Sequence, residues 1–94
     1  MNFFKNYKRD GTLTVHMREG CSPRCASGQD TAPATEDEFA WPRADGARVM
    51  WSHQENAGEL RGEKTYRRWT CRQCWWRYRD RKGLNLTIDI GPTN

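Results

Sequence analysis

Four cysteines are the residues of this chain with the clearest potential for chemistry. They form two close pairs, Cys21-x3-Cys25 and Cys71-x2-Cys74, with 45 residues between the pairs. Closely spaced pairs let a chain place two thiolates about 2.3 Å from one tetrahedral zinc ion. Soft thiolate ligands also favour zinc over hard cations such as Mg²⁺. The spacing therefore predicts one Zn²⁺ ion, bound by all four cysteines.

A zinc ion with four protein ligands is structural, because no position is left for a reactive water molecule. Its binding contributes roughly 10–16 kcal/mol of apparent free energy, comparable to the stability of a small domain. Two alternatives remain for the cysteines: a pair of disulfides, with three possible connectivities, or a thioredoxin-like redox role for Cys71 and Cys74. His16 and His53 could each replace a cysteine as a ligand, although an isolated histidine is more often a surface or strand residue.

Length and composition explain why the chain needs a metal ion or disulfides to stabilise its fold. Its 94 residues are 35% hydrophobic, with a mean hydropathy of −1.09, which predicts one small domain over residues 1–94 with little material for a core. The opening MNFFKNYKRDG lacks the apolar stretch of a signal peptide, and no run approaches the ~20 apolar residues of a membrane span. We therefore expect a cytoplasmic protein without membrane contact, in which thiols stay reduced.

The elements that must position the cysteines follow from alternation and turn residues. Residues 1–19 predict two extended segments joined by a two-residue turn at Asp10-Gly11, with Leu13, Val15 and Met17 on one face. Further strands are predicted over residues 46–52, 64–71 and 84–90, and a helix from Cys71 or Arg72 to a stop at Gly83. Residues 28–38 are predicted to be a mobile surface loop, and residues 53–63 are also loop-like. The order predicts an α+β domain with short antiparallel strands and one C-terminal helix.

Aromatic residues near the second cysteine pair have two possible uses. Trp69, Trp75 and Tyr78 could pack beneath the zinc site, because a small core needs large side chains. Helical phase places Trp75 inside and Trp76 partly outside. An exposed Trp76 or Tyr78 could instead stack on a nucleic-acid base.

The charge is concentrated in the same part of the chain. Residues 61–82 contain nine basic and two acidic residues, a net charge of +7, so the rest of the chain carries −3 of the total of +4. Most of these cations are arginine, which suits bidentate recognition of phosphate or carboxylate. A solvated basic surface without a partner is the alternative. The predicted partner-binding residues are Arg67, Arg68, Arg72, Trp76, Arg77, Tyr78, Arg79, Arg81 and Lys82.

The pattern CSPRC, then EFAWPRADG, then RWTCRQCWWRYRDR resembles treble-clef zinc fingers. More narrowly, it is similar to small zinc-ribbon proteins common in bacteriophages, which are related in pattern to endonuclease VII-like HNH proteins. The similarity covers roughly residues 21–83 and implies a zinc-stapled, treble-clef-like fold. The first cysteine pair departs from the family in having three intervening residues where two are usual.

Catalysis is not expected. The nuclease relatives carry a histidine-rich core with a general base and ligands for a catalytic cation. Here only His53 lies between the cysteine pairs and no histidine follows Cys74. A phosphate-binding glycine loop is also absent from the sequence, and we expect no small-molecule substrate.

The sequence therefore favours a non-catalytic zinc-binding module that binds DNA or RNA through its basic, aromatic segment. The alternative is a phage-type inhibitor or modulator that docks on a host nucleic-acid machine such as RNA polymerase, a nuclease or a CRISPR complex. In that role the acidic TEDE segment could mimic DNA, or the basic helix could contact an acidic protein surface. An HNH-type nuclease is the weakest of the three hypotheses.

Overall fold

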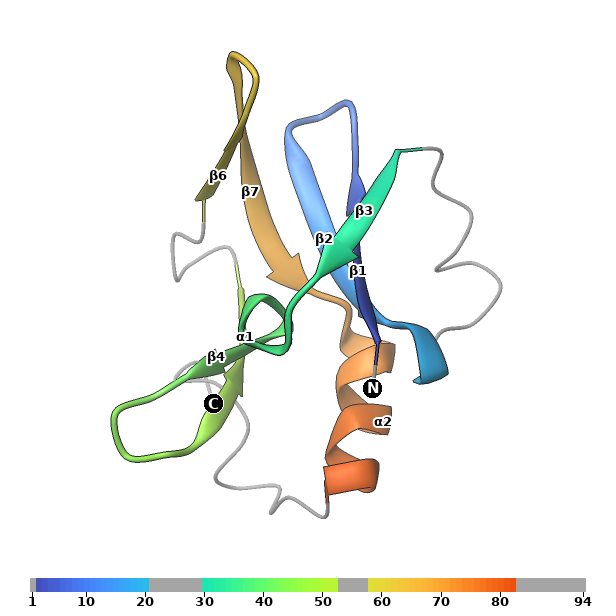
Figure 1. The fold of residues 1–94 in the computed structure, drawn as a ribbon, viewed down its shortest axis with the longest axis vertical. Helices are drawn as coiled ribbons and strands as arrows, with labels where there is room; N and C mark the ends of the chain where they lie inside the picture. Colours follow the sequence, from blue (N-terminus) through green and yellow to red (C-terminus); the bar gives the residue numbers. More distant parts are fainter. Residues whose placement is uncertain (1, 21–29, 53–57, 83–94) are drawn as a thin grey trace.

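The computed structural model describes residues 2–20, 30–52 and 58–82, which form a mixed α+β domain with a curled sheet and one C-terminal helix (Figure 1). The five-stranded sheet has the order β3-β1-β2-β7-β6, and β4 and β5 form a separate two-stranded sheet. The large sheet contains β1 (Phe3–Tyr7), β2 (Thr12–Met17), β3 (Thr31–Ala34), β6 (Gly58–Arg61) and β7 (Lys64–Thr70). The other elements are η1 (Arg18–Gly20), α1 (Glu36–Phe39), β4 (Ala40–Pro42), β5 (Arg48–Met50) and α2 (Arg72–Lys82).

The predicted N-terminal hairpin is confirmed, with one change in its loop. Strands β1 and β2 pair antiparallel from Phe3 opposite Met17 to Tyr7 opposite Leu13. The Lys8 N–H donates to the Thr12 carbonyl at 2.9 Å, which leaves a loop of three residues where the sequence predicts two. Gly11 closes this loop with φ 89°, a conformation that glycine adopts without steric cost.

Strands β2 and β7 pair in parallel, whereas the sequence predicts only antiparallel strands. Val15 lies opposite Thr70, and the Cys71 N–H donates to the Val15 carbonyl at 2.9 Å. Parallel neighbours require a long connection, and here the chain builds β3 to β6 between them. No local pattern in either strand encodes this pairing.

The sheet curls strongly enough to bring strands together that are not neighbours in it. Lys5 on β1 lies 2.9 Å from a carboxylate oxygen of Glu59 on β6, and the Tyr7 hydroxyl donates to the same carboxylate. In the sheet, β2 and β7 stand between these two strands. An ion pair of 2.5 Å between Arg61 and Asp30 joins the two edges. Side chains thus link the edges of the curled sheet.

The prediction of a loop over residues 28–38 is wrong for its described part. Residues 31–34 form β3, an edge strand of the described sheet, and an edge is where a sheet tolerates a proline such as Pro33. Helix α1 follows, begun by a capping box in which the Thr35 side chain accepts from the Glu38 N–H and Glu38 accepts from the Thr35 N–H. The Thr-x-x-Glu pattern in the sequence was the signal for this helix.

The loop-like assignment of residues 53–63 is also wrong in part. Residues Gly58–Arg61 form β6 and pair antiparallel with β7 around a two-residue turn. Gly62, with φ 65°, begins that turn. The β-propensity of residues 58–61 is weak, so β6 depends on its pairing with β7. The predicted strand at residues 84–90 and the cysteine loop at residues 21–28 lie outside the described residues.

The predicted strand near Met50 is confirmed as β5, and a buried threonine connects it to β7. The Thr70 hydroxyl donates to the Phe39 carbonyl at 2.5 Å and accepts from the Trp51 N–H at 3.1 Å. Trp51 also stacks on Trp41, with ring centroids 5.0 Å apart. Thr70 therefore joins the small sheet and α1 to the large sheet.

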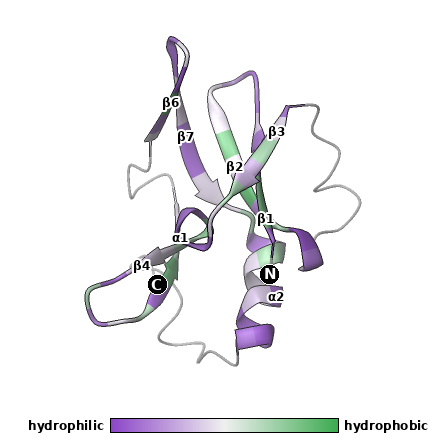
Figure 2. Ribbon diagram, viewed as in Figure 1, coloured by the Kyte–Doolittle hydropathy of each residue, from purple (hydrophilic) through white to green (hydrophobic). Residues whose placement is uncertain are grey.

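The core forms between one face of β2, α1 and the inner face of α2. As predicted, Leu13, Val15 and Met17 are fully buried. Figure 2 shows apolar residues along β2, while the C-terminal end of α2 is hydrophilic. The aromatic contribution comes from Phe39, Trp75 and Tyr78, whose rings lie 5.2–5.9 Å from one another. Each such buried side chain contributes roughly 1.5–3 kcal/mol.

Carboxylates of α1 are paired with cations inside the curled sheet. Lys5 lies 2.6 Å from Glu38 and 2.9 Å from Glu59. Burial alone would raise the pKa of Glu38, but hydrogen bonds from Lys5 and from the Thr35 backbone outweigh it, and the net effect lowers the pKa. A hydrogen bond from the Tyr78 hydroxyl, with a further contribution from Lys82, likewise lowers the pKa of Glu36.

These shifts predict a loss of stability in acid. Because the folded-state pKa values of Glu36 and Glu38 lie below 4.5, their stabilisation is complete above that pH and is lost as the pH falls through the folded values. Glu38→Gln should lower the free energy of unfolding by about 1 kcal/mol at pH 7, and by less as the pH falls below 4.5. Urea titrations at pH 7 and pH 3 measure this, with the exposed Glu63→Gln as control. A pH-independent loss would contradict the assignment.

Thr70→Val keeps the shape of the side chain but leaves the Trp51 N–H and the Phe39 carbonyl without their partner. We expect a loss of about 1–3 kcal/mol in the free energy of unfolding, since the Phe39 carbonyl stays buried and the Trp51 N–H stays partly buried. Urea denaturation measures it. Thr65→Val, on an exposed position of the same strand, is the matched control and should change stability little. Equal stability of the two variants would show that Thr70 does not connect the sheets.

Candidate metal centre

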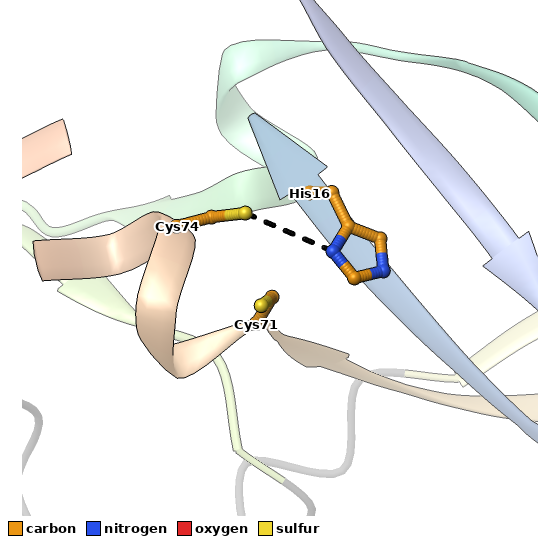
Figure 3. A group of neighbouring side chains, drawn as sticks. All are labelled: His16, Cys71 and Cys74. Carbon is orange, nitrogen blue, oxygen red and sulfur yellow. Dashed lines mark hydrogen bonds between the residues drawn. The ribbon is translucent and has the colours of Figure 1, made fainter. Parts of the chain in front are cut away.

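Three soft donor side chains meet where β7 ends and α2 begins. The donor atoms of His16, Cys71 and Cys74 all lie within 4.8 Å of one another. Figure 3 shows the histidine reaching toward the two cysteines from β2, with Cys71 at the strand–helix junction and Cys74 on the first helical turn. The group could hold a metal ion.

The x2 spacing of the cysteines has a local structural cause. Cys71 precedes the first residue of α2, and its carbonyl accepts the Trp75 N–H at 2.9 Å, so it occupies the N-cap position. Its thiol accepts from the Cys74 backbone N–H, one turn along the helix. Cys74 therefore returns to the side of Cys71, and its side chain is fully buried.

His16 is a candidate ligand that sequence reasoning placed only among the alternatives. Its position follows from the parallel register, because the pairing of Val15 with Thr70 puts the next residues, His16 and Cys71, side by side. The imidazole is only 6% exposed and stacks on Phe4 at 4.9 Å. The signal in the sequence was its place on a clearly alternating strand, but only the pairing with β7 reveals its neighbours.

The distance between Cys74 and His16 fits a tetrahedral ion. The Cys74 Sγ lies 3.7 Å from the His16 Nδ1. An ion with a metal–sulfur distance near 2.3 Å and a metal–nitrogen distance near 2.0–2.1 Å separates such atoms by about 3.6 Å at the tetrahedral angle. The other ring nitrogen, Nε2, is buried and has no hydrogen-bond partner among the described residues. Nδ1 is thus the donor that faces the cysteines.

The surroundings of Cys71 favour its thiolate form. Hydrogen bonding with Cys74 lowers the pKa of the Cys71 thiol far below 9.0, and His16 adds to this effect, whereas burial opposes it. The position at the N-terminus of α2 acts in the same direction. The thiolate is the form of cysteine that binds metals. Within the described residues, neither Cys71 nor Cys74 forms a disulfide.

Of the four predicted zinc ligands, the structure brings Cys71 and Cys74 together. Cys21 and Cys25 lie outside the described residues, as does His53. A tetrahedral ion held by the three described donors has one further position. The described part of the site therefore contains His16, which the sequence offers only as a replacement for a cysteine.

The predicted partner-binding residues divide between surface and interior. Tyr78 is fully buried and Arg79 is 5% exposed, so neither belongs to the accessible face. Tyr78 lies three residues after Trp75 and shares its inward side of the helix. Arg68 is half-buried, 3.6 Å from Glu38 and stacked on Trp51. The exposed members are Arg67, Arg72, Trp76, Arg77, Arg81 and Lys82.

No family model, curated protein or solved structure shows significant similarity to this chain. Within the described residues, no helix is long and apolar enough to cross a membrane.

Removal of His16 tests the centre. We expect the purified protein to contain about one zinc per chain, and His16→Gln to release zinc to a competing chelator at least about tenfold more readily, because one of the described donors is lost. Metal analysis and chelator titration measure this. His53→Gln is the matched control and should retain zinc. Zinc loss in the His53 variant alone would contradict the described cluster.

Proposed function

We propose that this chain is a non-catalytic zinc-binding module that binds nucleic acid through the outer face of α2. The observation that carries the proposal is the contrast between the acidic residues of α1 and the arginines of α2. Carboxylates of α1 are paired with cations of the same molecule, whereas arginines on α2 stay exposed to solvent. An exposed arginine face is suited to phosphate groups.

Zinc is the ion that the donors support best. Two thiols and an imidazole, all partly or fully buried, form a soft set of the kind found in structural zinc sites. In the proposal, Cys21 or Cys25 supplies the fourth ligand, which completes a treble-clef-like arrangement with the β7–α2 junction. The bound ion would supply a cross-link between β2, the start of α2 and the segment of residues 21–25. A closed site of this kind leaves no ligand position for a reacting water, and the proposal therefore excludes metal-activated hydrolysis.

Helical spacing organises the outer face of α2 into two rows. Arg72 and Trp76 form one row, and Arg77 and Arg81 form the next. Arg72 and Arg77 form no ion pair with any residue in the described ranges. Lys82 is different, because it lies 3.2 Å from Glu36. The proposed phosphate contacts come from the arginines of the two rows, with Arg67 as a further exposed cation on β7.

The acidic segment supports this choice over DNA mimicry. Glu38 pairs with Lys5, and Asp37 pairs with Arg48. The Glu36 carboxylate accepts a hydrogen bond from the Tyr78 hydroxyl at 2.5 Å and lies near Lys82. These carboxylates hold α1 against the rest of the domain. A host-protein inhibitor of phage type remains the second candidate, and we expect it to dock through its basic helix.

Arg77→Ala combined with Arg81→Ala should leave zinc content and fold unchanged while weakening nucleic-acid binding. If each arginine contacts one phosphate, the slope of log K against log salt should fall by about 1.8 on duplex DNA or about 1.4 on a single strand. Fluorescence anisotropy over a salt series measures both effects. Arg43→Ala, on the exposed turn after β4, is the control. Unchanged nucleic-acid binding in the double variant would show that α2 is not part of the interface.

A pull-down from bacterial lysate separates the two candidates. With nuclease treatment, recovered nucleic acid should disappear if the proposal is correct. One host protein retained at stoichiometric yield after nuclease, and lost in the Arg77 and Arg81 variant, would establish the protein-docking function in its place.

A further inference from the structure

Trp76 is an exposed aromatic residue on the outer face of α2, which also carries Arg72, Arg77 and Arg81. It is 45% exposed, and Leu60 is the other large apolar side chain that is exposed among the described residues. The neighbouring Trp75 is 1% exposed and fills the core. One residue along a helix turns the side chain by about 100°, so Trp76 contributes nothing to that core. Its indole lies beside Arg72, one helical turn earlier.

Arg79 holds this indole in place. Its guanidinium lies 4.6 Å from the centroid of the Trp76 ring, the arrangement of a cation–π contact. Arg79 is itself only 5% exposed, so the contact is made by a side chain that is anchored in the domain. The accessible part of the indole is thus the side away from Arg79. A fixed aromatic surface of this kind loses little conformational freedom when a flat partner stacks on it.

We infer that Trp76 is a stacking platform for an unpaired nucleobase, so that the ligand of the α2 face is single-stranded DNA or RNA. The inference rests on the proposed function and specifies its substrate class. In a duplex the faces of the bases are covered by their neighbours, whereas a single strand offers each base face to an aromatic ring. Arg72 lies one helical turn before Trp76, and Arg77 and Arg81 form the neighbouring row, so we expect these arginines to contact the phosphates that flank the stacked base. Every base has such a face, so binding should tolerate changes in sequence.

The test compares Trp76→Ala with the intact protein on a single-stranded oligothymidine and on a duplex of equal length. Stacking predicts a loss of about 5- to 150-fold in affinity for the single strand, with duplex affinity within about twofold and the salt slope unchanged. Trp76→Phe should retain most of the single-strand affinity, because it keeps an aromatic face. Leu60→Ala, the other exposed apolar position, should change neither affinity. Zinc content and circular dichroism confirm that each variant is folded.

The outcomes distinguish stacking on Trp76 from the proposed nucleic-acid binding on which it rests. Equal or absent losses on single strand and duplex in Trp76→Ala, together with weaker binding in the Arg77 and Arg81 variant, would overturn stacking and leave nucleic-acid binding intact. Binding to neither ligand by the intact protein would overturn both. If Trp76→Ala instead abolished a nuclease-resistant complex with a host protein, the tryptophan would be a protein-interface residue and the inference would fall.

Discussion

The parallel pairing of β2 with β7 is the constraint on which the rest of the structure depends. It places His16 beside Cys71 and fixes the point at which α2 leaves the sheet. The same pairing directs the opposite face of β2, with Leu13 and Val15, toward α1 and the inner side of α2. One register thus positions both the donor cluster and the core. A shift of one residue would turn His16 to the other face of the sheet and separate it from the cysteines.

A second constraint is the disposition of charge. The curl of the sheet brings Lys5 between Glu38 and Glu59, and it joins the sheet edges through Arg61 and Asp30. The pairs that Lys5 forms are partly buried and are screened by water less than surface pairs are, whereas the Arg61–Asp30 pair is exposed. Among the cations that stay exposed are Arg72, Arg77 and Arg81 on α2. The molecule thereby acquires a basic face without an excess of exposed acidic residues beside it on α1.

Helix α2 combines three tasks on different sides of one short element. Its first turn holds Cys74 at the donor cluster, its inner side supplies Trp75 and Tyr78 to the core, and its outer side carries the arginines. In the proposed function, the ion and the core fix the helix so that its cations and Trp76 present a constant geometry. This arrangement explains why so small a chain places cysteines, aromatic residues and arginines within a few residues of one another.

The sequence by itself determined the elements whose signals are local. Alternation predicted β2 and its buried face, turn residues located the first hairpin, and helical phase separated Trp75 from Trp76. The two cysteines of the second pair, with their x2 spacing, predicted that part of the candidate site. Only the tertiary structure decided that His16 joins them and that β2 and β7 run parallel. Residues 31–34 and 58–61 became strands for the same reason. Each of these features depends on a partner distant in the chain, and neither periodicity nor propensity records which distant segments pair.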